Sequence, residues 1–247
     1  MVALVLSQTV FRSVLDDDDD DAYTAAGDRT GEGQSEYIPD EEDPDLAPPP
    51  PEIFTQAPTT NCTIPDDYTP AGSADPGTIR GGDLQYTIPD GWDFPWGGSD
   101  SLPPYMTETD GQGRNVEGNW YSVVSLGKVV WPEDEGGYQG ARADGRGPVP
   151  VLCDHGGRAH PVRENPTVTD YRSETIDVDG HSGWIVQATY HFEDPPDSLS
   201  TTSASIVTSI VVETDDGPSA LVSDVAADHE DHVQNLEDII ASLEVVG

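Results

Sequence analysis

The strongest constraint on the fold is a run of three predicted β-strands between Thr167 and Thr214. In the middle strand, apolar and polar residues alternate from Trp184 to Glu193, the period of two of a strand with one buried face. Asp179-Gly180 precedes it and tolerates the positive φ angles of a tight hairpin turn, and Asp194-Pro-Pro-Asp197 ends it. The β-branched run Ser203–Glu213 supplies the third strand. The sequence therefore predicts an antiparallel meander.

The rest of the folded part is less regular. A first strand is predicted over Gly82–Trp92 and another over Asn119–Trp131. Asp93–Gly118 is rich in Gly, Pro and Asp, which predicts a long loop pinned by aromatic residues. Apolar residues at helical spacing predict a terminal helix from Val225 to Leu243, with Asp224 as its N-cap. We expect an α+β fold, an antiparallel β-sheet with helices packed on its faces.

Residues 1–15 are apolar, but they are fewer than the ~20 residues that span a bilayer and lack the basic leader of a signal peptide. Two interpretations stay open: a short amphipathic or core element, or the outer half of a membrane anchor that is truncated because Met1 is not the true start. We favour the anchor, because the acidic run Asp16–Asp21 is better tolerated on the outer side of a membrane. Residues 16–60 are predicted to be a disordered, acidic, Pro-rich tether, and residues 61–247 a single domain.

The chain is strongly acidic, with 48 Asp and Glu against 10 Lys and Arg and a formal net charge of −38. The tether is not the only source of negative charge, because the chain from Asn61 onward still carries 33 acidic and eight basic residues. Such a surface repels phosphates and anionic lipid headgroups, so we expect no nucleic-acid partner. We interpret the acidity as a solubility surface suited to high salt, in preference to a dedicated cation-binding surface.

Cys62 and Cys153 are the only cysteines in the chain. An even pair fits an oxidising compartment better than a redox site, which more often has Cys-x-x-Cys spacing, so we expect them to form a disulfide. The alternative is two independent buried thiols. The bond would clamp the start of the domain to the segment that ends at Cys153, and closing a loop of that length would contribute about 4 kcal/mol.

The order of the predicted elements carries a family resemblance. The segments that carry it are GGDLQYTIPDGW, NWYSVVSLGKVVW, IDVDGHSGWIVQATYHF, SIVTSIVVE, ALVSDV and IIASLEVV. In this order they resemble the PsbP-like α/β/α sandwich of exported or lipid-anchored proteins from high-GC Gram-positive bacteria, the LpqN type among them. The resemblance covers Gly81 to Gly247 and implies an accessory or protein-binding module, not generally an enzyme. No ligand residues carry over, because that fold has no shared active-site motif.

Few other residues suggest chemistry. His155-Gly156-Gly157 is similar to the oxyanion loop of α/β-hydrolases, but the Gly-x-Ser-x-Gly elbow of those enzymes is absent from the sequence. Trp92, Trp96 and Trp120 could line a ligand pocket, but packing in the core is the favoured interpretation. We therefore expect no catalytic residues and no cofactor.

His229 and His232 are three residues apart on the predicted terminal helix and lie beside Asp228, Glu230 and Asp231. At this spacing they share a helix face and could in principle hold a metal. A solvated polar face is the favoured interpretation, because the sequence places no further His or Cys ligand. We assign no metal ligand here.

These observations favour a non-catalytic extracytoplasmic domain, held at the cell membrane by the N-terminal anchor and presented through the tether, that binds a protein or a small ligand. The functional alternatives are a cytosolic acidic assembly or chaperone-like protein and, less favoured, an uncharacterised hydrolase. For location, the alternatives are a secreted or a cytoplasmic protein. The sequence assigns no ligand-binding residues.

Overall fold

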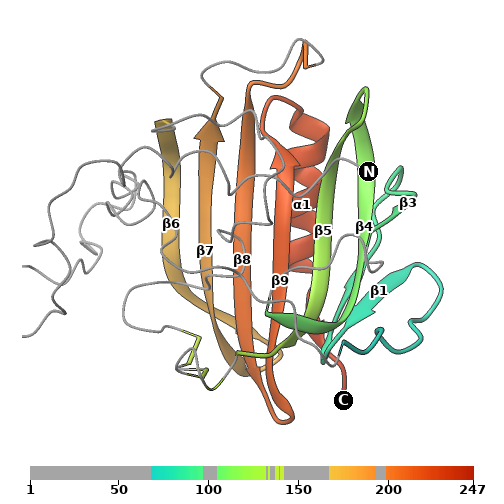
Figure 1. The fold of residues 1–247 in the computed structure, drawn as a ribbon, viewed down its shortest axis with the longest axis vertical. Coiled ribbons are helices and arrows are strands. Elements are labelled where there is room, and N and C mark those ends of the chain that lie inside the picture. Colours follow the sequence, from blue (N-terminus) through green and yellow to red (C-terminus); the bar gives the residue numbers. More distant parts are fainter. Residues whose placement is uncertain are drawn as a thin grey trace, which may run out of the picture.

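The fold is seen in a computed structural model, which describes residues 68–96, 105–131, 133, 137, 138, 140, 141, 167–192 and 199–247. Its main element is an antiparallel sheet of seven strands in the order β3-β4-β5-β9-β8-β7-β6 (Figure 1). In that order the strands are β3 (Phe94–Pro95), β4 (Met106–Glu117), β5 (Trp120–Val129), β9 (Gly217–Ala226), β8 (Ala204–Thr214), β7 (His181–His191) and β6 (Thr167–Val178).

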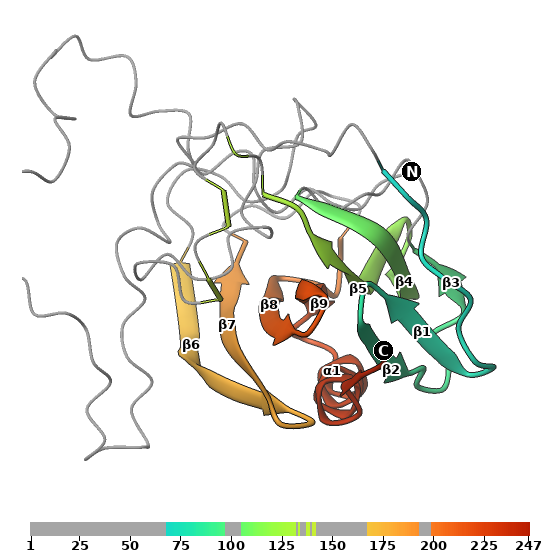
Figure 2. The ribbon, with the colours of Figure 1, turned by 90° about the horizontal axis from the view of Figure 1, so that it is seen from below.

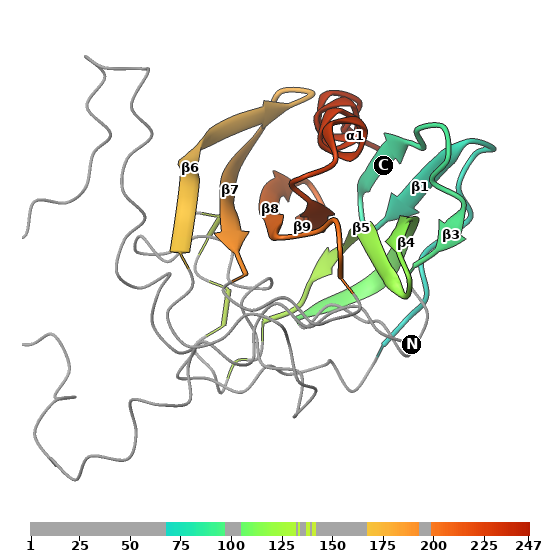
Figure 3. The same cartoon turned by 90° about the horizontal axis from the view of Figure 1, so that it is seen from above.

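The helix α1 (Glu230–Ala241) lies in the concave side of this sheet. Figures 2 and 3 show the sheet curling around the helix, with β6 and β7 on one side of it and a small second sheet on the other. The strands of the small sheet, in spatial order, are β1 (Thr78–Gly81), β2 (Leu84–Thr87) and β10 (Glu244–Val245). Because β10 follows α1 closely in the chain, the helix is fixed between the two sheets.

The predicted meander is confirmed, since β6, β7 and β8 are consecutive antiparallel strands. The β6–β7 hairpin turns through Asp179 and Gly180, whose φ angles are 54° and 84°, and Val178 pairs with His181 on either side of the turn. A two-residue turn of this kind needs positive φ at both central positions. The local sequence therefore sets both the turn and the register of the hairpin.

The core lies between the concave face of the large sheet and α1. Leu236 and Ile239 of α1 are buried there. They belong to one cluster with the fully buried side chains of Leu84, Tyr86, Leu126, Ile185, Ile210 and Leu221. A smaller cluster covers the other face of the sheet and contains Tyr171, Val186, Ala188, Tyr190 and Val207. Neighbouring residues such as Ile185 and Val186 thus face opposite sides of the sheet, and both sides are buried.

The predicted α+β class is wrong. The described residues are 58% strand with one short helix, so the fold is mainly β and is not a sheet with helices packed on its faces. The terminal helix was also predicted to begin too early: Asp224, the expected N-cap, and Val225 both belong to β9. The helix begins at Glu230, with His229 at the N-cap position. Small and β-branched residues favour a strand over Ser219–Ala226, and pairing with β5 and β8 overrides the helical spacing there.

The segment Asp93–Gly118, predicted to be a loop, contains the 12-residue strand β4. The strand escapes prediction because most of its residues are polar or glycine and do not alternate with apolar ones. Gly111 has a packing reason: a Cβ at this position would lie 2.3 Å from the main-chain oxygen of Trp96 and 2.6 Å from that of Val124. The close approach of these two main-chain oxygens therefore requires glycine here.

We expect Gly111→Ala to lower the free energy of unfolding by about 1 to 3 kcal/mol, because the added methyl group would push against the main-chain oxygens of Trp96 and Val124. Urea denaturation measures this free energy. Gly72→Ala is the matched control, since nothing lies within 4 Å of a Cβ at that position. An equal loss in both variants would contradict the packing explanation.

Asp224 is a half-buried residue in the middle of the large sheet, and one of its two carboxylate oxygens is buried there. It lies on β9 between Val123 of β5 and Val207 of β8, and its Oδ1 atom is buried without a hydrogen-bond partner. Burial raises the pKa of Asp224 to about 7, and the nearby Ser205 hydroxyl opposes this rise only in part. The Ser205 oxygen makes no well-formed hydrogen bond, which agrees with a weak opposing effect. The folded protein therefore binds a proton at Asp224 more tightly than the unfolded chain does.

We expect Asp224→Asn to raise the Tm at about pH 8 and to change it little at about pH 3. The ionised carboxylate destabilises the fold only above its usual pKa of 3.8, increasingly so up to about 7, and fully at higher pH. The full effect is at most about 4 kcal/mol. Thermal unfolding across this pH range measures it. Asp215→Asn, in the exposed β8–β9 turn, controls for the loss of one negative charge, and a gain in Tm that did not vary with pH would oppose this account.

Several predictions concern residues outside the described part of the chain, among them the anchor at 1–15 and the tether at 16–60. The predicted disulfide between Cys62 and Cys153 is wrong, because the structure has no cysteine pair at disulfide distance; both cysteines lie outside the described residues. The prediction rested on the number and spacing of the cysteines, and neither brings two sulfur atoms together. No helix in the described ranges is long and apolar enough to cross a membrane.

Candidate metal centre at the start of helix α1

Three side chains that can bind a metal ion lie together at the start of α1. One ligand atom from each of His229, Asp231 and His232 lies within 4.8 Å of the other two. Imidazole nitrogen and carboxylate oxygen are typical ligands of zinc. In the part of the chain that the structure describes, this is the one group of at least three His, Cys, Asp or Glu side chains that meets this distance.

A short turn between β9 and α1 sets the position of this cluster. In the turn, Asp228 binds the loop that leads into β8, because its Oδ2 atom accepts the N–H groups of Ser203 at 2.5 Å and Ala204 at 3.2 Å. The Ser203 hydroxyl also donates to this carboxylate, at 3.0 Å from Oδ2. The first turn of the helix is thereby fixed against one end of the sheet.

His232 is the buried member of the cluster, with 3% of its surface exposed. Its Nδ1 atom lies 2.8 Å from the hydroxyl oxygen of Ser122 on β5, and the same oxygen accepts the N–H group of Ala226 at 3.0 Å. Burial, and after it the positive charge of Arg114, lowers the pKa of His232 to about 4 against the opposing effect of Asp231. His232 is therefore neutral at neutral pH, with its ring fixed through Nδ1 and its Nε2 atom left for another partner.

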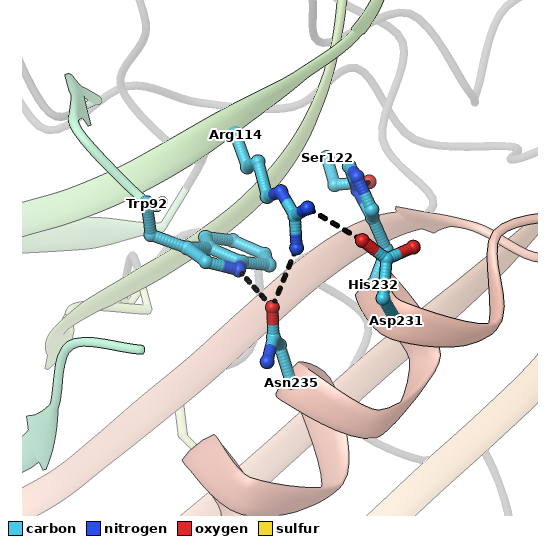
Figure 4. Close-up of polar contacts among 6 residues, drawn as sticks. All are labelled: Trp92, Arg114, Ser122, Asp231, His232 and Asn235. Carbon is cyan, nitrogen blue, oxygen red and sulfur yellow. Dashed lines mark hydrogen bonds and ion pairs between the residues drawn. The ribbon is translucent and has the colours of Figure 1, made fainter. Parts of the chain in front are cut away.

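Asp231 takes part in a polar network that joins α1 to β4 (Figure 4). Its Oδ2 atom lies 2.5 Å from a guanidinium nitrogen of Arg114, and a second nitrogen of Arg114 donates to Oδ1 of Asn235 at 3.0 Å. The indole N–H of Trp92 donates to the same Asn235 oxygen at 2.9 Å. Partial desolvation favours a higher pKa, but Arg114 and His232 together hold the pKa of Asp231 below its usual value. Asp231 is thus ionised, and its Oδ1 atom is not used by Arg114.

His229 is partly exposed and faces the loop before β8. Its Nε2 atom lies 3.3 Å from the hydroxyl of Thr201. That loop is anchored by Glu117 at the end of β4, whose carboxylate accepts the N–H groups of Ser200 at 2.7 Å and Thr201 at 2.9 Å. Desolvation acts to raise the pKa of Glu117, but the hydrogen bonds from these donors outweigh it and hold the pKa well below its usual value. Two carboxylates therefore fix the loop that His229 contacts, Glu117 at residues 200 and 201 and Asp228 at residues 203 and 204.

The contact between Ser122 and His232 does not form a nucleophile and base pair. Ser122 is fully buried, and its oxygen already accepts a main-chain N–H group. A serine nucleophile must be reachable by the carbonyl group that it attacks. His155, which suggested a hydrolase in the sequence, lies outside the described residues.

The structure brings His229 and His232 together, as the helical spacing indicated. The favoured interpretation of this segment as a solvated polar face is wrong for His232, which is buried. Of the acidic neighbours, only Asp231 joins the cluster; Asp228 binds the adjacent loop, and the carboxylate of Glu230 lies outside the group.

Sequence reasoning missed the side chains that surround the cluster. Asn235 lies one helical turn after Asp231, so its spacing was a usable signal. Trp92, Arg114 and Ser122 are more than 100 residues away in the chain from the helix residues that they contact, and nothing in the sequence links them. The tryptophans Trp92, Trp96 and Trp120 are all buried, which confirms the prediction that they pack in the core.

Comparison with protein families and with curated proteins finds no match for this chain. The resemblance to PsbP-like domains therefore stays a prediction. The α/β/α sandwich that it implied is not the observed arrangement, because the described residues include one short helix and are mainly strand.

We expect Ser122→Ala to lower the free energy of unfolding by about 1 to 3 kcal/mol, because it leaves the buried ring of His232 and the N–H group of Ala226 without their shared partner. Denaturation in urea measures the change. Ser182→Ala, at an exposed position on β7, is the control. Similar stabilities of the two variants would show that the Ser122 hydroxyl does not support the histidine.

Proposed function

We propose that this domain is a non-catalytic binding module whose site holds a divalent transition-metal ion, with zinc as the best fit. The observation that carries the proposal is the approach of donor atoms of His229, Asp231 and His232 to within 4.8 Å. Tetrahedral zinc with nitrogen and oxygen ligands requires donor atoms about 3.4 Å apart. Small rotations of the two less buried side chains, His229 and Asp231, would bring the donor atoms to the spacing that zinc requires.

The surroundings of two donors support the assignment. Ser122 engages Nδ1 of His232 and leaves Nε2, while Arg114 engages Oδ2 of Asp231 and leaves Oδ1. Metal ligands in proteins are commonly held by such outer hydrogen bonds, which fix the orientation of the ligand. Both groups are also in the ionisation state that a metal ligand needs.

Two nearby positive charges oppose a cation at this position. Arg114 is one, and the N-terminal end of the α1 dipole is the other, with an effect of about 1 kcal/mol. Zinc ligation is stronger, on the order of 10 kcal/mol for sites with four protein ligands, and the net charge of −38 also attracts cations. We therefore expect coordination by the three donors to outweigh the local repulsion.

We also propose where the domain is located and what the metal site binds. We place the domain on the extracytoplasmic side of the cell membrane, presented by an anchor at 1–15 through the acidic tether at 16–60; the support is the apolar segment followed by an acidic run. Three protein donors leave one position of a tetrahedral site for an outside ligand. The protein or small ligand that this domain recognises would occupy that position.

The test is isothermal titration of the metal-free full chain with zinc chloride. We expect one tight site per chain, and a loss of affinity of at least about tenfold in His229→Ala and in Asp231→Asn, because each removes one of the three donors. Glu230→Gln is the matched control, since it removes a neighbouring carboxylate that is exposed and outside the cluster. Magnesium chloride is the control for non-specific binding to the acidic surface.

Three outcomes would contradict the proposal. The first is no zinc site in the natural chain, and the second is equal weakening in Asp231→Asn and Glu230→Gln, which would show that only total charge matters. The third is magnesium binding as tight as that of zinc, because hard cations prefer sites made of oxygen ligands.

A further inference from the structure

The outer edge of β6 forms one margin of the large sheet and has no partner among the described strands. β6 (Thr167–Val178) pairs with β7 on one side, and no described strand pairs with its other side (Figure 1). It is 12 residues long, and most of its residues are at least partly exposed. An exposed strand edge presents unpaired N–H and C=O groups and can pair with another chain.

The opposite margin of the same sheet is covered. β3 pairs with β4 at Gly113 and Gln112. Further along β4, Pro70 bridges to Thr109, and the N–H group of Glu108 donates to the main-chain oxygen of Thr69 at 2.7 Å. The described part of the chain thus pairs with the β4 margin, whereas none of its strands pairs with the β6 margin.

Hairpin geometry identifies the main-chain groups that face outward. In a two-residue hairpin, the pair next to the turn exchanges hydrogen bonds, and such pairs recur at every second residue. Val178 pairs with His181, so positions 178, 176, 174 and 172 bond to β7. The N–H and C=O groups of Ser173, Thr175 and Asp177 therefore point away from the sheet.

A bulge limits the usable part of this edge. The register with β7 shifts between Thr169 and Arg172, and Asp170 has a positive φ of 53°. Bulges interrupt pairing with another strand. The seven residues from Arg172 to Val178 are free of this shift and form the regular segment of the edge.

We infer that the segment Arg172–Val178 pairs with the same segment of a second copy of this chain, antiparallel about a two-fold axis at Thr175. This register uses all seven regular residues and joins the outward-facing groups of Ser173, Thr175 and Asp177 to those of the partner. Two threonines then lie opposite each other on the axis, a favourable cross-strand pair. The large sheets of the two copies become continuous, and the two-fold symmetry closes the assembly at two chains.

Charge also favours this edge as the meeting surface. Arg172 and Glu174 form an ion pair, with 44% and 52% of their side chains exposed, and Asp177 adds one negative charge. The segment is nearly neutral in a chain of net charge −38, and the register places no two charged residues directly opposite each other. Approach at β6 therefore brings together few like charges, and added salt weakens the remaining repulsion between the two chains.

Sedimentation equilibrium of the full chain in high salt tests the pairing. We expect a monomer and dimer equilibrium that Thr175→Pro shifts at least about tenfold toward monomer, because proline removes an outward N–H donor from the centre of the interface. The bonds of β6 to β7 do not use this N–H group, so the Tm at a concentration where the chain is monomeric should stay close to that of the natural protein. Thr175→Ala, which keeps the donor, is the matched control.

Cysteine cross-linking tests the register. In a chain with Cys62 and Cys153 replaced by serine, Thr175→Cys should form a disulfide-linked dimer under mild oxidation, because residues opposite each other at the axis have Cα atoms about 5.5 Å apart. Thr167→Cys, exposed at the far end of the same strand, should remain monomeric.

A natural chain that stays monomeric at all concentrations would overturn the inference. A dimer that Thr175→Pro does not weaken, or equal cross-linking through positions 167 and 175, would overturn it as well, since the contact would then lie elsewhere or in another register. None of these results bears on zinc binding, which uses the first turn of α1.

Discussion

The burial of α1 in the concave side of the large sheet is the contact on which the rest of the structure depends. Leu236 and Ile239 meet side chains from both sheets there, and full burial of each contributes about 2 to 3 kcal/mol. Because the same helix face also carries His232, the packing that stabilises the core brings this histidine over Ser122. The packing of the hydrophobic core therefore sets the position of His232 in the candidate metal centre.

The sequence predicted those parts of the fold in which local and tertiary preferences agree. In β6, β7 and β8, alternation, β-branched residues and the Asp179-Gly180 turn all favour the same pairing. In β4, apolar and polar residues do not alternate. Its Gly111, for example, is required by the close approach of main-chain oxygens and not by the burial of one face. At the end of β9, apolar residues satisfied the spacing of a strand and of a helix at once, and only pairing with neighbouring strands decides between them.

The site was predictable only along the helix. The spacing of His229 and His232 indicated a shared face, but whether that face meets solvent or the sheet depends on the curvature of the sheet, which no local pattern encodes. Arg114 and Ser122 reach the site from β4 and β5 because those strands pair in register. The cysteines show the converse limit, because an even number of cysteines indicates a bond but does not say where the fold places them.

The small sheet has a consequence for how the chain is made. β10 pairs with β2, so Glu244 and Val245 meet Gln85 and Leu84, residues synthesised about 160 positions earlier. The N–H group of Val245 also donates to the carboxylate of Asp179 at 2.9 Å, which ties this last strand to the β6–β7 turn. During synthesis the small sheet can be completed only after β10 has emerged, because one edge of β2 has no partner until then. A chain interrupted before residue 244 would keep that edge open, and an unpaired strand edge makes an incomplete chain prone to aggregate.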